Sequence, residues 1–279
     1  MKKILYLIAA VAMLSVVVAC SNDDEPRRGN GVFTVNTPMI NHMYNTVTGQ
    51  VMGVSSTHNK LVIDTVNHKA TLEFTYNDGT ETTVTFDDLK ATETWPRFYT
   101  LTSAGDASFS GYVNFNQEAT MRYRLTTADG IRIISTTPDV FFLNTKSVIE
   151  YDDTTKTSVT HNAMYQFTID ASTSKAIVEV MDIVHVKDYK SFINITGNSV
   201  PVTVTPNGYT VAGQNISTNA RYVFFNDSTG EKWMETNKYP FKTFNATIDL
   251  VNDTLNATYM LGNSATVTAT GRTFLNYNH

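Results

Sequence analysis

The feature that most constrains the fold is a two-residue alternation of apolar and polar side chains along much of the chain. Apolar residues occupy every second position at 72–76, 244–250 and 265–269, and threonine, asparagine or a charged residue fills many positions between them. This period places one row of side chains inward and the other outward, as in antiparallel strands with one buried face. Turn-forming pairs such as Asp129-Gly130 separate the segments. We therefore predict an all-β fold.

Helical spacing is limited to short stretches. Residues 39–44 and 89–94 each fit about one helical turn, and no segment predicts a long helix. The chain is 42% hydrophobic and 11% aromatic, which favours a packed protein over a disordered one. Its length allows one large or two ordinary domains.

The first residues form a secretory signal. A positive segment at 1–3 precedes an apolar run at 4–18 that is too short for a permanent membrane span. Residues 17–20, Val-Val-Ala-Cys, resemble the lipobox of bacterial lipoproteins. The resemblance implies that residues 1–19 are removed and that Cys20 is diacylated as the mature N-terminus. Two acyl chains would anchor the protein stably to lipid.

A short acidic run follows the cysteine. It resembles the surface-export signal of Bacteroidetes lipoproteins and consists of Ser21, Asn22, Asp23, Asp24 and Glu25. The resemblance implies a protein on the outer membrane that faces outside; a periplasm-facing lipoprotein stays open as the alternative. A polar, flexible tether is predicted over 20–31. Because Cys20 is the only cysteine, its acylation excludes disulfides, thiolate catalysis and cysteine metal sites.

An internal repeat divides the mature chain. Residues 63–74 and 169–180 both read Ile-Asp, four residues, Lys-Ala, and then an alternating strand with a glutamate at the same step. A looser copy begins at 248. The pattern fits a hairpin whose aspartate side chain binds backbone amides of the turn. We predict two related antiparallel β lobes, 32–145 and 146–279, each barrel-like or a sandwich.

The regular succession of hairpins and strands, which ends at 263–271, resembles that of the calycin-like β-barrel lipoproteins of Bacteroidetes. That resemblance implies an up-and-down barrel closed by its terminal strand. A pair of antiparallel sandwiches would produce the same alternation, so both architectures stay open.

Catalytic motifs are absent from the sequence. It contains no Gly-x-Ser-x-Gly, no His-Glu-x-x-His, no phosphate-binding glycine loop and no calcium loop. We predict a non-enzymatic protein without cofactor or metal, although two carboxylates from distant strands could still form a glycosidase pair. The formal charge of −5 gives no support for nucleic acid as a partner. His42, beside Met39 and Met43, is the one cluster of soft ligands and leaves haem capture as an alternative.

Two tryptophan segments are candidates for ligand binding. Trp95 is followed by Arg97 and Tyr99, and Trp233 by Tyr239. Aromatic rings stack on the apolar faces of sugars while polar neighbours hold the hydroxyls. The segments also fit plugs of a barrel end, which is the commoner role of tryptophan. The predicted function is capture of a glycan or a small apolar molecule, and the rival is a fimbrial subunit.

Four turns match the Asp-Ser/Thr pattern of O-glycosylation in exported Bacteroidetes proteins. We predict modification at one or more of their hydroxyls, which belong to Thr65, Thr154, Ser228 and Thr254.

Overall fold

The computed structural model describes residues 31–272 apart from short gaps at 78–79, 104–108, 116–119, 152–156, 162, 185–191, 227–229, 237–238 and 263–264. Every regular element in this part is a β-strand, so the predicted all-β class is confirmed. The segments 39–44 and 89–94, whose spacing fits a helical turn, both lie within long strands.

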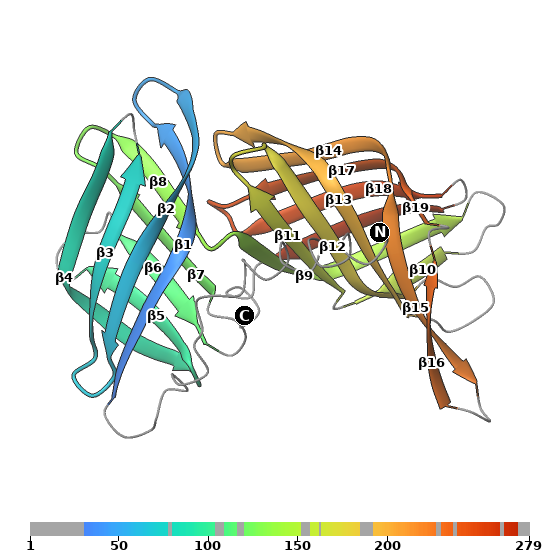
Figure 1. Cartoon of the computed structure of the whole chain (residues 1–279), viewed down its shortest axis with the longest axis horizontal. Helices are drawn as coiled ribbons and strands as arrows, with labels where there is room; N and C mark the ends of the chain where they lie inside the picture. Colours follow the sequence, from blue (N-terminus) through green and yellow to red (C-terminus); the bar gives the residue numbers. More distant parts are fainter. Residues whose placement is uncertain are drawn as a thin grey trace, which may run out of the picture.

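Eight strands in chain order form the first barrel, here called barrel 1 (Figure 1). They are β1 (Val32–Asn45), β2 (Gln50–Asp64), β3 (Lys69–Asn77), β4 (Glu81–Trp95), β5 (Phe98–Ser103), β6 (Ser110–Asn114), β7 (Thr120–Thr126) and β8 (Ile131–Thr136). Each strand is antiparallel to the next, and β1 pairs with β8 over 40–45 and 131–136 to close the ring. This is the up-and-down arrangement, in which closure removes the exposed sheet edges.

The remaining strands form one sheet that curls on itself. They are β9 (Asp139–Tyr151), β10 (Thr157–Thr160), β11 (Met164–Asp170), β12 (Lys175–Val184), β13 (Phe192–Thr205), β14 (Gly208–Ile216), β15 (Thr218–Asn226), β16 (Gly230–Thr236), β17 (Phe241–Asp249), β18 (Thr254–Leu261) and β19 (Ala265–Arg272). Pairing runs β12-β11-β9-β19-β18-β17-β14-β13, and β12 also pairs with β13. These eight strands therefore make a second ring in chain order, here called barrel 2.

Three strands lie outside the ring of barrel 2. β10 pairs only with β9, and β15 pairs with part of β13 and with β16, so that the β15–β16 hairpin projects from the wall (Figure 1). Among the described strands, β10 and β16 therefore have an unpaired edge.

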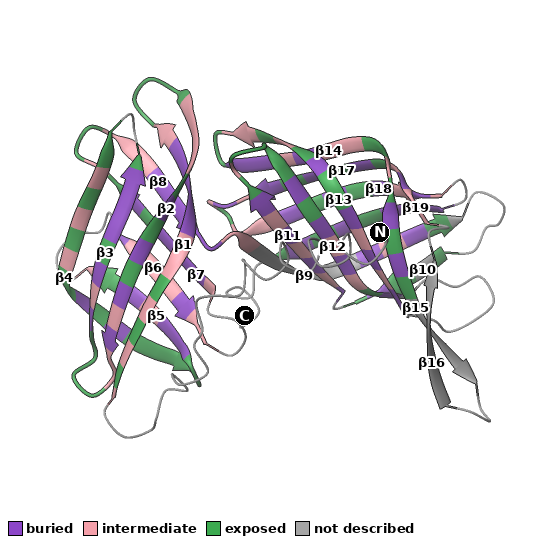
Figure 2. Cartoon of the chain, in the orientation of Figure 1, coloured by how far each residue is buried: buried purple, intermediate pink, exposed green. Residues whose placement is uncertain are grey.

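Burial follows the predicted alternation and defines the inside of each barrel (Figure 2). In β19, for example, Ala265, Val267 and Ala269 are buried, whereas Thr268 and Thr270 are exposed. The apolar rows fill the barrels and the polar rows face outward. A barrel that crosses a membrane has the reverse pattern, with an apolar outer band.

The repeat seen in the sequence occupies the same hairpin in both rings. Residues 64–69 connect the second and third strands of barrel 1, and 170–175 connect the second and third ring strands of barrel 2. In each turn the aspartate Oδ1 accepts two backbone N–H groups, at 3.0 and 2.9 Å for Asp64 and at 2.9 and 3.4 Å for Asp170. The fourth turn residue has a positive φ, 56° at His68 and 52° at Ser174.

The two barrels meet in the chain at a short connection. The predicted boundary at 145/146 lies inside β9, which pairs only within barrel 2, while the ring of barrel 1 ends at β8.

Candidate functional site between the barrels

The outer wall of barrel 1 covers one end of barrel 2. Ile40 on β1 and Ile134 on β8 point out of barrel 1 and are buried in the hydrophobic cluster of barrel 2. His42 lies between them and the β13–β14 turn, where its Nε2 is 2.6 Å from the carbonyl oxygen of Thr205. Its ring also contacts the edge of Tyr209, with 5.7 Å between ring centroids. Burial lowers the pKa of His42, so the imidazole is favoured in its neutral form.

Three arginines of barrel 1 bind the turns of barrel 2. Arg122 on β7 forms an ion pair with Asp253 in the β17–β18 turn. Arg124 on the same strand donates to the carbonyl of Val251 at 3.4 Å. Arg132 on β8 donates to the carbonyl of Pro206 at 2.7 Å. Cations on one barrel therefore meet backbone carbonyls and a carboxylate on the other.

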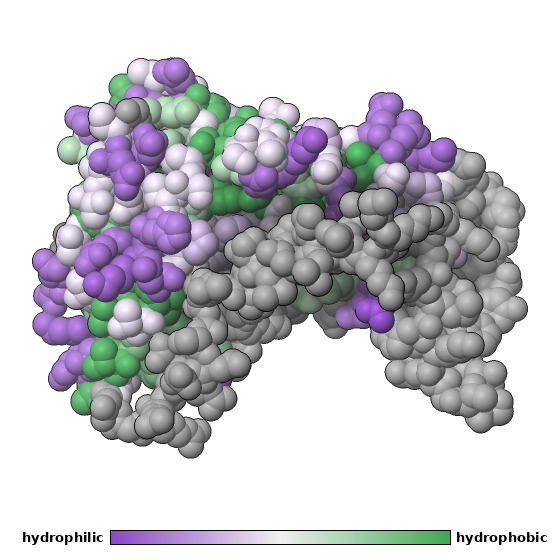
Figure 3. Space-filling view, viewed as in Figure 1, coloured by the Kyte–Doolittle hydropathy of each residue, from purple (hydrophilic) through white to green (hydrophobic). Residues whose placement is uncertain are grey.

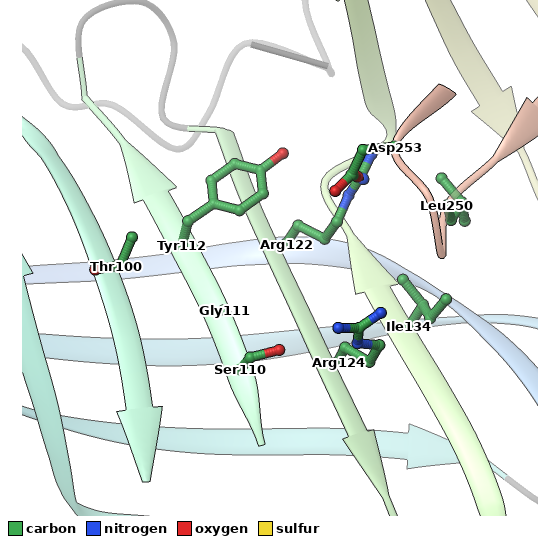
Figure 4. A pocket seen from close by; sticks show the side chains of 9 residues that line it. All are labelled: Thr100, Ser110, Gly111, Tyr112, Arg122, Arg124, Ile134, Leu250 and Asp253. Atoms are coloured by element: carbon green, nitrogen blue, oxygen red, sulfur yellow. The ribbon is translucent and has the colours of Figure 1, made fainter. Parts of the chain in front are cut away.

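A cavity of about 180 Å³ lies at this junction (Figure 4). Its lining combines hydroxyl, charged and apolar side chains: Thr100, Ser110, Gly111, Tyr112, Arg122, Arg124, Ile134, Leu250 and Asp253. Six come from β5, β6 and β7 of barrel 1, one from β8, and two from the β17–β18 turn of barrel 2. The volume is below the range of about 300–1,000 Å³ for drug-sized sites, so the cavity suits a ligand of monosaccharide size.

The guanidinium of Arg122 is the central charge of the cavity. The residue is only 7% exposed, and its Nε has no acceptor among the described residues. Its guanidinium lies 5.9 Å from the ring centroid of Tyr112, and Figure 4 shows it extending to Asp253. Asp253 compensates Arg122, whereas the more exposed Arg124 has no ion-pair partner among the described residues and supplies the positive charge of the cavity.

The hydroxyl of Tyr112 stays protonated at neutral pH. Burial raises its pKa, and the positive charge of Arg122 only partly opposes that rise. Tyr112 can therefore donate a hydrogen bond into the cavity, beside the hydroxyls of Thr100 and Ser110.

The tryptophan segments lie elsewhere and do not converge. Trp95 is 53% exposed at the β4–β5 turn, and Arg97 occupies that turn with φ 63°. Tyr99 is buried in the core of barrel 1. Trp233 lies on β16, at the opposite end of the molecule, and its side chain is outside the described residues (Figure 1). Tyr239 packs partly buried against the core of barrel 2.

The other predicted sites have different surroundings. Cys20, the run 21–25, Thr154 and Ser228 lie outside the described residues. The hydroxyl of Thr65 donates to the carbonyl of Gly31 at 2.9 Å, and Thr254 is the first residue of β18.

The soft-ligand cluster around His42 does not form. Met39 and Met43 point into the core of barrel 1, whereas His42 points outward. Among the described residues, no group of three or more His, Cys, Asp or Glu side chains is arranged to hold a metal ion. That same part of the chain contains no helix able to span a bilayer.

Sequence reasoning missed the residues of the cavity. One signal was available: Arg122 and Arg124 alternate with buried Tyr123 and Leu125, which places two cations on the outward face of one strand. Asp253, the partner of Arg122, belongs to a turn 131 residues away, and no local pattern connects the two residues.

Fold and site together define an all-β protein of two joined antiparallel barrels with a small cavity between them that is lined by polar and apolar side chains. No family model matches the chain, and no curated protein matches its sequence. A solved structure from Bacteroides fragilis, which carries the provisional description of outer membrane protein, is similar over 87% of this chain and 97% of its own. Its sequence identity is 14% and its TM-score 0.34, so the likeness adds nothing to the inferences below.

Proposed function

We propose that the chain is a non-enzymatic lipoprotein of the outer membrane, held by acylated Cys20 and facing outside, that captures an acidic sugar between its barrels. The observation that carries the ligand assignment is the cavity in which Arg124 supplies a positive charge beside three hydroxyl side chains. Leu250 and Ile134 add an apolar surface to the same lining. A sugar presents hydroxyls and an apolar ring face, and this mixture favours it over a purely apolar ligand.

The acidic character of the ligand follows from charge. A guanidinium pairs with a carboxylate through charge-assisted hydrogen bonds, which contribute more than neutral ones. Arg122 is already paired with Asp253, so the ligand carboxylate is assigned to Arg124. Capture needs no further chemistry, in accord with the absence of catalytic motifs from the sequence.

Calorimetric titration with glucuronate and galacturonate, beside glucose and galactose, tests the ligand. We expect both uronates to bind and the neutral sugars to bind at least tenfold more weakly. Arg124→Ala should weaken uronate binding by about 1.5–3 kcal/mol, the range for a hydrogen bond to a charged group. Lys90→Ala removes an exposed cation of β4 that does not line the cavity and should leave binding unchanged. Equal binding by wild type and Arg124→Ala would contradict the assignment.

Anchoring is tested separately. Wild-type protein purified from its native membrane should carry the acyl mass, whereas Cys20→Ala should lack it and be recovered in the soluble fraction. Protease added to intact cells should cleave an outward-facing protein; protection until the outer membrane is opened would instead place it on the periplasmic face.

A further inference from the structure

One end of barrel 1 gathers exposed apolar side chains. The up-and-down order places the start of β1, the β2–β3 turn and the β4–β5 turn at the same end. Val32, Val66 and Trp95 lie there and are 53%, 70% and 53% exposed. They make up half of the six strongly exposed large apolar residues in the described part of the chain. Figure 3 shows apolar surface at this lower end of barrel 1, below a more polar wall.

The chain also enters the barrel at this end. Thr65 in the β2–β3 turn donates its N–H to the carbonyl of Gly31 at 2.6 Å, and its hydroxyl donates to the same oxygen at 2.9 Å. A Cβ on Gly31 would lie 2.4 Å from a methyl of Val66, so the entering backbone and the exposed valine are in close contact. The segment that leads back to Cys20 therefore starts from this rim.

The length of that segment limits how far the rim can lie from lipid. Residues 20–31 span at most roughly 40 Å when fully extended, at about 3.3–3.6 Å per residue. A flexible coil of the same length has an end-to-end distance of about 20 Å. A short tether gives the rim a high effective concentration at the membrane, so weak contacts suffice to hold it there.

We infer that this rim, formed by Val32, Val66 and Trp95, is a docking surface for the lipid bilayer. The inference rests on the proposed acylation of Cys20. Tryptophan is enriched at the level of lipid headgroups because its ring is apolar and its N–H polar. Arg97, exposed in the same turn as Trp95, lies where an anionic headgroup would meet it. The rim therefore binds a lipid surface, and barrel 1 contacts the membrane with the end from which the tether leads to Cys20.

Fluorescence quenching of the acylated protein tests this docking. The variant Trp233→Phe leaves Trp95 as the only tryptophan. It is reconstituted in vesicles of phosphatidylcholine and phosphatidylglycerol with brominated acyl chains. We expect the emission of Trp95 to shift to the blue and to lose at least half its intensity, whereas Trp95→Phe, which retains Trp233, should show no quenching. Val32→Ser with Val66→Ser should reduce the quenching, and Val47→Ser, in the turn at the opposite end of barrel 1, should not.

The outcomes separate this inference from the proposed anchor. A protein that floats with the vesicles while Trp95 is unquenched overturns the docking and leaves the anchor intact. A protein that carries no acyl mass and does not float refutes the anchor itself. A blue-shifted but unquenched Trp95, with a dimer mass in analytical ultracentrifugation, would show that a second copy covers the rim and would overturn lipid docking.

Discussion

The two barrels share a strand order but are filled differently. Both interiors contain aromatic clusters. In barrel 2, Phe241, Phe244 and Tyr259 contact one another at 4.9–5.4 Å between ring centroids, and barrel 1 has a cluster around Tyr123. Barrel 1 combines an apolar core with buried amides, Asn41 and Asn59, both fully buried. The comparison shows that the hairpin order and the filling of a barrel are separate properties of a sequence, since one topology accepts both interiors.

The buried amides of barrel 1 replace backbone hydrogen bonds where the ladder between β2 and β3 ends early. The β2–β3 pairing ends at Lys60 and Glu73. Beyond it, Asn59 Oδ1 accepts the N–H of Thr75 at 2.9 Å, and Asn41 Nδ2 donates to the Thr75 carbonyl at 3.2 Å. Side chains thus satisfy backbone groups that a longer ladder would have paired.

In barrel 2 an asparagine side chain also binds a backbone group where strand pairing is irregular. At the irregularity in the β12–β13 pairing, the N–H of Asp182 donates to Asn194 Oδ1 at 2.8 Å. This site is exposed, whereas the asparagines of barrel 1 are sealed inside. The two barrels therefore differ in where an asparagine side chain replaces a ladder hydrogen bond, inside barrel 1 and at the surface of barrel 2.

The largest effect on stability is expected from replacing one buried phenylalanine in each barrel with alanine. Phe244→Ala in barrel 2 and Phe74→Ala in barrel 1 should each lower the free energy of unfolding by about 3–5 kcal/mol. Both side chains are almost fully buried. Because Ile40 and Ile134 of barrel 1 are buried in the cluster of barrel 2, calorimetry should show that each variant also lowers the stability of the other barrel. If calorimetry instead shows two unfolding transitions and the substitution lowers the temperature of only one, the barrels unfold independently.

A smaller effect is expected from the asparagines. Asn59→Ala leaves the buried N–H of Thr75 without its acceptor and should cost about 1–3 kcal/mol in urea unfolding. Asn194→Ala removes the equivalent bond at an exposed site, where water can replace it, and should cost about 0.5 kcal/mol or less. Equal losses of unfolding free energy in the two variants would contradict the distinction between a buried hydrogen bond in barrel 1 and an exposed one in barrel 2.

The sequence predicted the β-strands and the repeated hairpin because both depend on neighbouring residues. Alternation and turn chemistry are local, and the Ile-Asp to Lys-Ala repeat marks corresponding hairpins of two rings. The spacing at 39–44 fits a helical turn as well as a strand for a physical reason. Met39 and Met43 are four apart, a spacing that places residues on one face of a helix and also on one face of a strand.

Closure and the cavity could not be predicted in the same way. The choice of barrel over sandwich depends on the pairing of β1 with β8 and of β12 with β13, which the alternation leaves open. The cavity requires β7 of barrel 1 to meet a turn of barrel 2, so Arg122 reaches Asp253 only after both barrels have formed and packed.

The junction should respond to mild acid because His42 is buried there. Burial lowers the pKa of His42 below 6.5, the value expected in the unfolded chain. The unfolded state therefore binds the proton more tightly, and stability that is full above pH 6.5 is lost as the pH falls from 6.5 through the lower pKa of the folded state. Arg132 adds repulsion to the charged form.

Urea midpoints at pH 8 and pH 5.5 measure that effect. Wild type should lose stability between these values, and His42→Gln should lose less. His58→Gln removes an exposed histidine of β2 and serves as the matched control. An equal pH dependence in wild type and His42→Gln would contradict a role for the junction histidine.

The smallest expected effect concerns the equivalent turns of the two barrels. Hydrogen bonds from the backbone and side chain of Asn67 hold the pKa of Asp64 below its ordinary value, and bonds from Ser172 and Thr173 do the same for Asp170. Each contribution to stability is present above the ordinary pKa of 3.8 and is lost as the pH falls through the lower folded value. Asn67→Ala keeps the backbone donor and removes the amide at 2.7 Å.

The pKa of Asp64 should therefore rise part of the way to its ordinary value in Asn67→Ala. Asp170 lies in barrel 2 and should titrate as in wild type, which makes it an internal control in the same NMR experiment. Because the hydrogen bonds of both carboxylates are exposed to solvent, the change in overall stability should be small even where the pKa moves clearly. An unchanged Asp64 pKa would show that the backbone amides alone account for the shift, and that the two turns are electrostatically alike despite their different side chains.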